Sequence, residues 1–270
     1  MNVDLHTHCN SADEDEIRAY VETCEKNDTF ALLSGGLHYG GYDYVPNEEV
    51  LEIAKRYPNN LGALAKLDLW DTPPDVSEAR RYADMGVKGF KFIYPYYAYN
   101  HESYLPLYEE IEKLGLPMLF HTGAYRQHPA DRIFRRPVLE NMSPITLDAV
   151  ARYFQDAKIV IAHMGTSLFR KLAADLVKLH PNLYFDLAGN GAFLGVTPHD
   201  LAELLRPANI TRDVTGANFL KLVFGSDSYI KYPYIQTEAL AAYRNIIMMN
   251  RIPEEDANKI LGGTVASWIA

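Results

Sequence analysis

Residues 3–34 read VDLHTHCNSADEDEIRAYVETCEKNDTFALLS and contain a strand, a helix and a second strand in that order. The runs Val3–His8 and Phe30–Ser34 are short and apolar, which is typical of buried strands. Ser11 is followed three residues later by Glu14, a capping-box pattern that predicts a helix start at this point. This succession indicates a right-handed unit with two parallel strands.

The same alternation continues along all 270 residues. Helix starts recur between strand-like runs, for example at Ser143-Pro144 and Thr197-Pro198, where proline would take the first helical position. Eight strand–helix units in about 250 residues are the size of a closed (β/α)8 or TIM barrel, so we expect an α/β fold with one domain over residues 1–270. The expected strands are Val3–His8, Phe30–Ser34, Leu61–Leu67, Val87–Ile93, Met118–His121, Ile159–His163, Leu183–Leu187 and Leu222–Asp227.

An open, doubly wound sheet is the alternative arrangement of such units. A dinucleotide-binding sheet of that kind carries a GxGxxG pattern after its first strand, and none follows Val3–His8. Gly35 and Gly36 follow the second strand but do not fit the pattern. The barrel is therefore the favoured fold.

Composition narrows the class of partner. With 26 Lys+Arg against 35 Asp+Glu the formal net charge is −9, which disfavours nucleic acids and anionic membranes and leaves a small-molecule substrate. Cys9 and Cys24 form no CxxC pair, so we expect two reduced thiols. We find no signal-peptide pattern and no apolar run of membrane-spanning length, and therefore predict a cytoplasmic protein. The aromatic stretch Tyr94–Tyr99 is a candidate cavity wall or a contact surface of a homo-oligomer.

Histidines and an aspartate end the predicted strands. Catalytic groups of a (β/α)8 barrel lie at the carboxyl ends of its strands, and the first strand ends His6-Thr7-His8. Side chains two apart on a strand point the same way. If Val3, Leu5 and Thr7 face the helices, both imidazoles face the barrel axis.

Three further strand ends carry ionisable side chains. His121 ends the fifth strand and His163 the sixth, and Asp227 ends the eighth strand beside the first. The imidazoles of the first and fifth strands and this carboxylate suit zinc, or alternatively manganese, with one position open for water. Unrelated structural roles are the alternative, but unpartnered buried ionisable groups are costly. An open position indicates catalysis.

Taken together, these motifs resemble the amidohydrolase superfamily and, within it, the amidohydrolase-2 family of TIM-barrel hydrolases and decarboxylases. The resemblance covers nearly the whole chain. It depends on the order of Asp4-Leu-His6-Thr-His8, Gly86-Val-Lys-Gly89-Phe-Lys91, Pro117-Met-Leu-Phe-His121-Thr-Gly, Lys158-Ile-Val-Ile-Ala-His163-Met-Gly, Pro181-Asn-Leu-Tyr-Phe-Asp186 and Phe224-Gly-Ser-Asp227.

The resemblance implies one divalent metal ion and a division of roles. By this resemblance His6, His8, His121 and Asp227 would hold the metal, and His163 would face the attacking water or the substrate. Other amidohydrolases carry a metal-bridging carboxylated lysine at the end of the fourth strand. We interpret Lys91 instead as a barrel lysine paired with a carboxylate.

The leading functional hypothesis is metal-assisted hydrolysis of a C–O or C–N bond. Asp227 would accept the proton of the attacking water and deliver it to the leaving group, while His163 stabilises the developing oxyanion or acts as the acid. Four arginines in the long loop after the fifth strand favour a carboxylate-bearing substrate, although a solvated basic loop is equally compatible. These arginines are Arg126, Arg132, Arg135 and Arg136.

Two other functions stay open at this point. Relatives with the same ligand set remove carbon dioxide from aromatic or unsaturated acids, so a non-oxidative decarboxylase is the main alternative. A barrel that binds metal without catalysis is the second alternative. His38, in a glycine-rich loop, could reach over the site, but a solvated loop histidine is the more common case.

Overall fold

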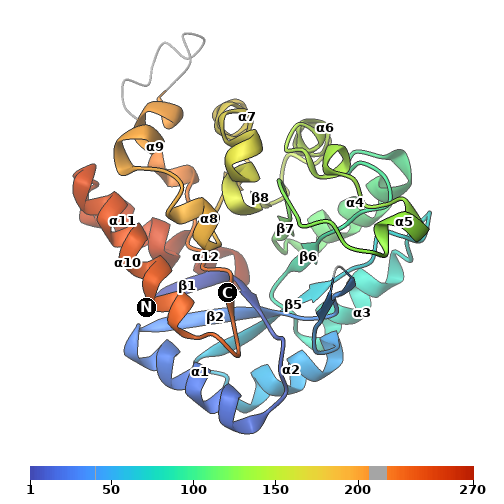
Figure 1. Ribbon diagram of the computed structural model, residues 1–270, viewed down its shortest axis with the longest axis horizontal. Helices are drawn as coiled ribbons and strands as arrows, with labels where there is room; N and C mark the ends of the chain where they lie inside the picture. The colour runs from blue at the N-terminus through green and yellow to red at the C-terminus, as the bar shows by residue number, and fades with distance from the viewer. Residues whose placement is uncertain (40, 207–217) are drawn as a thin grey trace.

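The computed structural model describes residues 1–39, 41–206 and 218–270. At its centre is an eight-stranded sheet in which all neighbouring strands run parallel (Figure 1). In sheet order the strands are β10 Ser228–Tyr229, β1 Asn2–His8, β2 Thr29–Ser34, β5 Leu61–Lys66, β6 Phe90–Phe92, β7 Met118–Phe120, β8 Ile159–Ile161 and β9 Leu183–Phe185.

Hydrogen bonds to residues 222–227 close the barrel between β9 and β1. Val223 N donates to Phe185 O of β9 at 2.9 Å, and Leu5 N of β1 donates to Phe224 O at 3.0 Å. The predicted eighth strand is thus an irregular segment between β9 and β1, and only its continuation, β10, has regular strand geometry. The predicted TIM barrel is confirmed.

Helices pack around the outer face of the barrel, and an antiparallel hairpin of β3 His38–Tyr39 and β4 Tyr42–Asp43 follows β2 (Figure 1). The α-helices are α1 Glu14–Lys26, α2 Asn47–Arg56, α3 Ser77–Met85, α4 Leu105–Leu114, α5 Asp131–Phe134, α6 Thr146–Tyr153, α7 Thr166–Leu179, α8 Asn190–Phe193, α9 Pro198–Leu205, α10 Tyr234–Met249, α11 Glu254–Asn258 and α12 Thr264–Ile269. Short turns of 3₁₀-helix are η1 Glu102–Tyr104, η2 Leu139–Met142, η3 Ala162–Gly165 and η4 Phe219–Lys221, and η5 Lys259–Gly263 is a π-helix.

One predicted helix start is confirmed and two are corrected. Thr197 caps α9 by accepting from Asp200 N, and Pro198 is the first helical residue. In α1 the cap is Asp13 rather than Ser11, because the Asp13 carboxylate accepts from two first-turn N–H groups. Pro144 precedes α6 by two residues instead of opening it.

An apolar layer fills the barrel interior beneath the carboxyl ends of the strands. It corrects the expected orientation of β1, because Val3 and Leu5 belong to this interior cluster instead of facing the helices. The register of β1 against β2 shifts between Asp4 and Thr7, so Leu5 and His6 both point inward. The cluster comprises Val3, Leu5, Leu32, Leu64, Leu119, Val160, Ala162, Val223 and, from α12, Val265.

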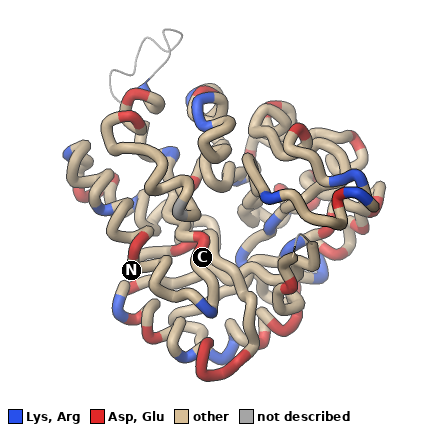
Figure 2. Tube along the Cα trace, viewed as in Figure 1, with Lys and Arg blue, Asp and Glu red and all other residues tan. Residues whose placement is uncertain are grey.

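The outer surface carries both charge signs. Figure 2 shows lysines and arginines interspersed with aspartates and glutamates along the outer helices. None of the helices in the described part of the chain has the length and apolar character needed to cross a bilayer.

Candidate active site

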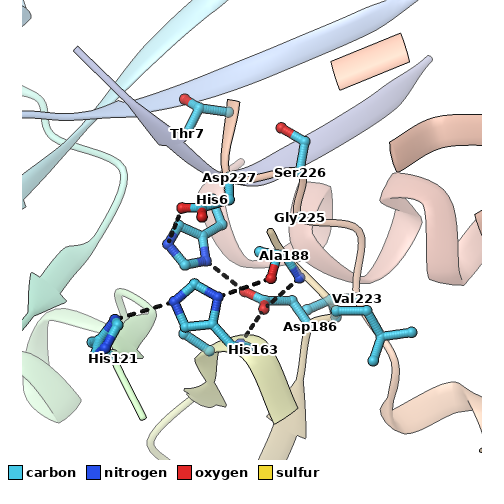
Figure 3. Close-up of polar contacts among 12 residues, drawn as sticks. His6, Thr7, His121, His163, Asp186, Ala188, Val223, Gly225, Ser226 and Asp227 are labelled. Atoms are coloured by element: carbon cyan, nitrogen blue, oxygen red, sulfur yellow. Dashed lines mark hydrogen bonds and ion pairs between the residues drawn. The ribbon is translucent and has the colours of Figure 1, made fainter. Parts of the chain in front are cut away.

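Two imidazoles of β1 and one carboxylate converge at the carboxyl end of the barrel. His8 Nε2 lies 2.8 Å and His6 Nε2 lies 3.6 Å from Asp227 Oδ1. One potential ligand atom from each of the three lies within 4.8 Å of the other two. Figure 3 shows the Asp227 carboxylate beside the His6 ring. The register shift in β1 and the irregular eighth segment together bring these side chains to one point.

His121 and His163 form a second pair next to this group. His163 Nε2 lies 3.1 Å from His121 Nδ1, and the rings of His163 and His6 have centroids 4.9 Å apart (Figure 3). His163 Nδ1 lies 2.8 Å from Ala188 O, which can only accept a hydrogen bond, so Nδ1 carries the hydrogen. If both imidazoles are neutral, His163 Nε2 is then an acceptor, His121 Nδ1 is the donor, and His121 Nε2 keeps a lone pair.

Asp186 holds His6 and His163 in place, a role that sequence reasoning missed. One of its oxygens accepts from His6 Nδ1 at 2.9 Å, and the other accepts from His163 N at 2.6 Å and Ala188 N at 3.0 Å. Because the Asp186 carboxylate accepts the hydrogen on Nδ1, the lone pair of His6 is on Nε2, which faces His8 and Asp227. Asp186 follows β9, so the rule of polar strand ends could have identified it.

Lys91 of β6 points into the barrel and contacts His6. Its Nζ lies 2.7 Å from His6 Nε2, so its direct partner is an imidazole, where we expected a carboxylate. Burial lowers the pKa of Lys91 to about 8, against the opposing effect of Asp186 and Asp227. A cation bound at His6 Nε2 would therefore require the Lys91 side chain to turn away.

The ionisation of the cluster suits a divalent cation. Burial lowers the pKa of His6, His8 and His121, which keeps these imidazoles neutral at pH 7. Burial alone would raise the pKa of Asp227, but the hydrogen bond from His8 and the nearby imidazoles lower it overall. Neutral imidazole and ionised carboxylate are the donors that zinc and similar ions prefer.

Two buried nitrogens of the cluster also lack partners. Among the described residues, neither His8 Nδ1 nor His121 Nε2 has a hydrogen-bond partner. An unsatisfied buried polar atom is costly, and a bound ion is one of the groups that can satisfy it. The residues present therefore fit a metal ion: His6, His8 and Asp227 are already grouped, whereas His121 contacts His163 and lies outside this group.

A cavity of about 520 Å³, the site cavity, opens above these residues. His8, His121, His163 and Asp227 all line it. Its walls are rich in tyrosine, namely Tyr42, Tyr44, Tyr94, Tyr125 and Tyr229. The rings of Tyr44 and Tyr229 each lie 5.2 Å from the ring of His8. Of the aromatic stretch Tyr94–Tyr99, Tyr94 lines this cavity, whereas Tyr96, Tyr97 and Tyr99 are not among its lining residues.

Of the four arginines predicted to recognise a carboxylate, only Arg126 is among the residues that line the site cavity. Arg136 instead stacks on Tyr96, with its guanidinium carbon 5.4 Å from the ring centroid. His38 is exposed and paired with Asp43 at 2.6 Å, as expected for a solvated loop histidine.

Comparison with known proteins agrees with this geometry. Residues 43–266 match the model of a protein family described as Amidohydrolase. No curated protein sequence matches the chain.

Solved structures with the same fold cover nearly the whole chain at low sequence identity. An uncharacterised TIM-barrel protein from Bordetella bronchiseptica aligns over 99% of this chain and 97% of its own, with a TM-score of 0.71 and 15% identity. A 2,6-dihydroxybenzoate decarboxylase from Rhizobium aligns over 99% and 98%, with a TM-score of 0.65 and 16% identity. A probable 2-pyrone-4,6-dicarboxylic acid hydrolase from Acinetobacter baumannii aligns over 99% and 98%, with a TM-score of 0.62 and 15% identity.

Proposed function

Because the chain belongs to the amidohydrolase family, whose members are metal-dependent enzymes, we propose that it is a hydrolase of small, carboxylate-bearing substrates. It would cleave a C–O or C–N bond with water. The observation that carries this proposal is the position of Asp227. Its carboxylate contacts two imidazoles, has a lowered pKa, and remains 20% exposed toward the site cavity.

The proposed metal ligands are His6, His8, His121 and Asp227, with zinc as the favoured ion and manganese as the alternative. A bound divalent cation would lower the pKa of water and polarise the scissile carbonyl. Neutral imidazole nitrogens suit zinc in particular. Cys9 and Cys24 are buried free thiols, which is compatible with work in the reducing cytoplasm.

We assign proton transfer to Asp227 and His163. An ionised carboxylate at the cavity can accept the proton of the attacking water and pass it to the leaving group. His163 lines the same cavity and is held by Ala188 O and by its own backbone N–H to Asp186, so its ring is fixed before substrate binds. A fixed imidazole can stabilise the oxyanion or serve as the acid.

Arg126 is the proposed partner of the substrate carboxylate. It lies on the lining of the site cavity with Thr166 and Ser167, at the start of α7. A guanidinium and the positive end of a helix both favour a carboxylate. We therefore expect substrates that carry an acid group to react faster than the corresponding amides.

Non-oxidative decarboxylation is the second candidate function. The tyrosine walls of the site cavity would accept an aromatic acid, and one of the similar structures is a decarboxylase by name. In that reaction the site would deliver a proton to carbon instead of activating water.

The deciding experiment combines a substrate screen with two variants. Lactones, amides and aromatic acids are incubated with the metal-loaded enzyme, and mass spectrometry distinguishes gain of water from loss of carbon dioxide. Asp227→Asn keeps the shape of the side chain but cannot accept a proton, so we expect kcat to fall by about 10² to 10⁴ with metal largely retained. His163→Asn should lower kcat with metal content unchanged.

Each alternative result has a definite meaning. If Asp227→Asn hydrolysed the substrate with the kcat of the wild type, Asp227 would have no role in proton transfer, and that role would pass to His163. Loss of carbon dioxide without hydrolysis of any compound would replace the proposed hydrolase with a decarboxylase.

A further inference from the structure

A second cavity of about 200 Å³ adjoins the site cavity. Leu37, Ile93 and Tyr94 line both cavities, so the two share a wall. Lys66, the last residue of β5, lines the second cavity and places it at the carboxyl-terminal edge of the barrel, where (β/α)8 enzymes bind substrates. The proposed proton transfer makes no use of this space.

Besides Tyr94, three aromatic side chains from different segments line the second cavity. Tyr39 comes from β3, Trp70 from the loop after β5, and Phe134 from the end of α5. Ring centroids are 5.7 Å apart for Tyr39 and Trp70 and 5.5 Å apart for Trp70 and Phe134. Trp70 Nε1 already donates to Tyr94 O at 2.7 Å, which leaves the indole ring for apolar contact. Phe134 is 51% exposed and would lose water on contact with a ligand.

The charges at the second cavity compensate one another. Lys66 Nζ lies 3.0 Å from Asp68 Oδ2, and the Lys66 side chain is only 9% exposed. His38, also on the lining, is paired with Asp43. Arg126 and Asp227, by contrast, are on the lining of the site cavity alone. A ligand group in the second cavity therefore meets no net charge that would select an ion.

We infer that the second cavity binds an uncharged planar ring of the same substrate whose reacting group lies in the site cavity. The inference rests on the proposed function, because that function places the reacting group beside Asp227. About 200 Å³ holds a single ring, and aromatic walls bind planar rings through edge-to-face and offset contacts. The Lys66–Asp68 pair could also hydrogen-bond a polar ring substituent. The substrate thus has an anionic, reacting part and a distal neutral ring.

Tryptophan fluorescence tests this inference without catalysis. The chain has two tryptophans, Trp70 and Trp268, so Trp268→Phe leaves Trp70 as the only indole. The probe is 4-nitrobenzyl alcohol, an uncharged ring that quenches indole emission on contact. We expect saturable quenching in the Trp268→Phe protein. Phe134→Ala should raise the Kd of the probe about two- to tenfold, because a ring contact is lost. Ile133→Ala is the matched control, since Ile133 is the preceding residue of α5, is 78% exposed, and is not among the lining residues of either cavity.

Quenching that never saturates, or equal weakening by Phe134→Ala and Ile133→Ala, would overturn the inference. A kinetic measurement then separates it from the proposed function. For an acid ester hydrolysed in the screen and its analogue with a distal phenyl ring, Phe134→Ala should raise KM for the ring-bearing compound alone. If the screen finds no hydrolysis, the proposed function fails while the binding result stands. If both compounds react and Phe134→Ala leaves the ratio of their KM values as in the wild type, the ring does not occupy the second cavity.

Discussion

At the scale of single residues, hydrogen bonds decide which nitrogen of each site histidine faces the cluster. Asp186 binds Nδ1 of His6 and leaves Nε2 toward the cluster, whereas Asp227 binds Nε2 of His8 and leaves Nδ1 without a partner among the described residues. The contact with His163 uses His121 Nδ1 and leaves His121 Nε2 without a partner among the described residues. These partners fix the orientation of each ring before any ligand arrives, and a metal held by His8 Nε2 and Asp227 would replace the hydrogen bond between them.

Metal content should depend on His121. We expect about one equivalent of a divalent transition metal in the purified wild type and substantial loss in His121→Ala, because a ligand nitrogen is removed. His38→Ala is the control, since that histidine is exposed and bound only to Asp43 among its described neighbours. Elemental analysis of dialysed protein checks the prediction. Equal metal in wild type and His121→Ala would exclude this histidine from the ligand set.

Lys91 offers a second test of the metal site. Its amino group contacts the His6 nitrogen that would bind the metal, so Lys91→Met should bind metal at least as tightly as wild type. Competition with a chelator measures this affinity. If the wild type instead held two equivalents and Lys91→Met lost one, the lysine would belong to a binuclear site.

At the scale of elements, backbone irregularities at strand ends and helix starts place the functional groups. The register shift in β1 brings His6 inward directly after the inward-facing Leu5. Asp4, which faces the helices, accepts hydrogen bonds from Ser226 N at 3.0 Å and Ser226 Oγ at 2.6 Å. This contact joins β1 to the irregular segment that carries Asp227, and so holds His6 and His8 in position relative to Asp227.

The start of α1 carries its own prediction. The Asp13 carboxylate accepts from Asp15 N and Glu16 N, both at 3.0 Å, so Asp13→Ala should lower the free energy of unfolding by about 1 kcal/mol. Asp13→Ser should lose less, because serine keeps an acceptor oxygen. Urea denaturation of the wild type, these two variants and Ser11→Ala measures the free energy of unfolding. A larger loss in Ser11→Ala than in Asp13→Ala would restore Ser11 as the cap.

At the scale of the whole molecule, the buried histidines couple stability to pH. The pKa values of His6, His8 and His121 are lowered by burial from an ordinary 6.5, so the unfolded chain binds these protons first on acidification. Stability of the metal-free protein should therefore fall as pH decreases through 6.5, by up to about 1.4 kcal/mol per pH unit for each histidine. Asp4 opposes part of this fall, because burial raises its pKa to about 7 and the folded chain takes up that proton first.

Urea unfolding of chelator-treated protein between about pH 7.5 and 5.5 measures this slope. His121→Gln should give a shallower slope than wild type, because one of the three groups no longer titrates. A metal-free wild type that becomes more stable on acidification would contradict the sign of the coupling.

The sequence alone determined the barrel and the candidate ligands. Local hydrophobic patterns predict the alternation of strands and helices. Parallel strands of a barrel end at one face, so we could expect the strand-end residues to lie near one another, namely His6, His8, His121, His163 and Asp227. The strand-end rule extends to Asp186, although its partners could not be read from the chain.

Only the tertiary structure decided the contacts that depend on irregular backbone and on distant segments. A one-residue shift in β1 reverses which side chains face the axis, and no periodic pattern encodes it. The contact of Lys91 with His6 joins two strands far apart in sequence, and the choice of Arg126 among four arginines depends on the path of a long loop. Such contacts arise from packing in three dimensions, which local sequence preferences do not specify.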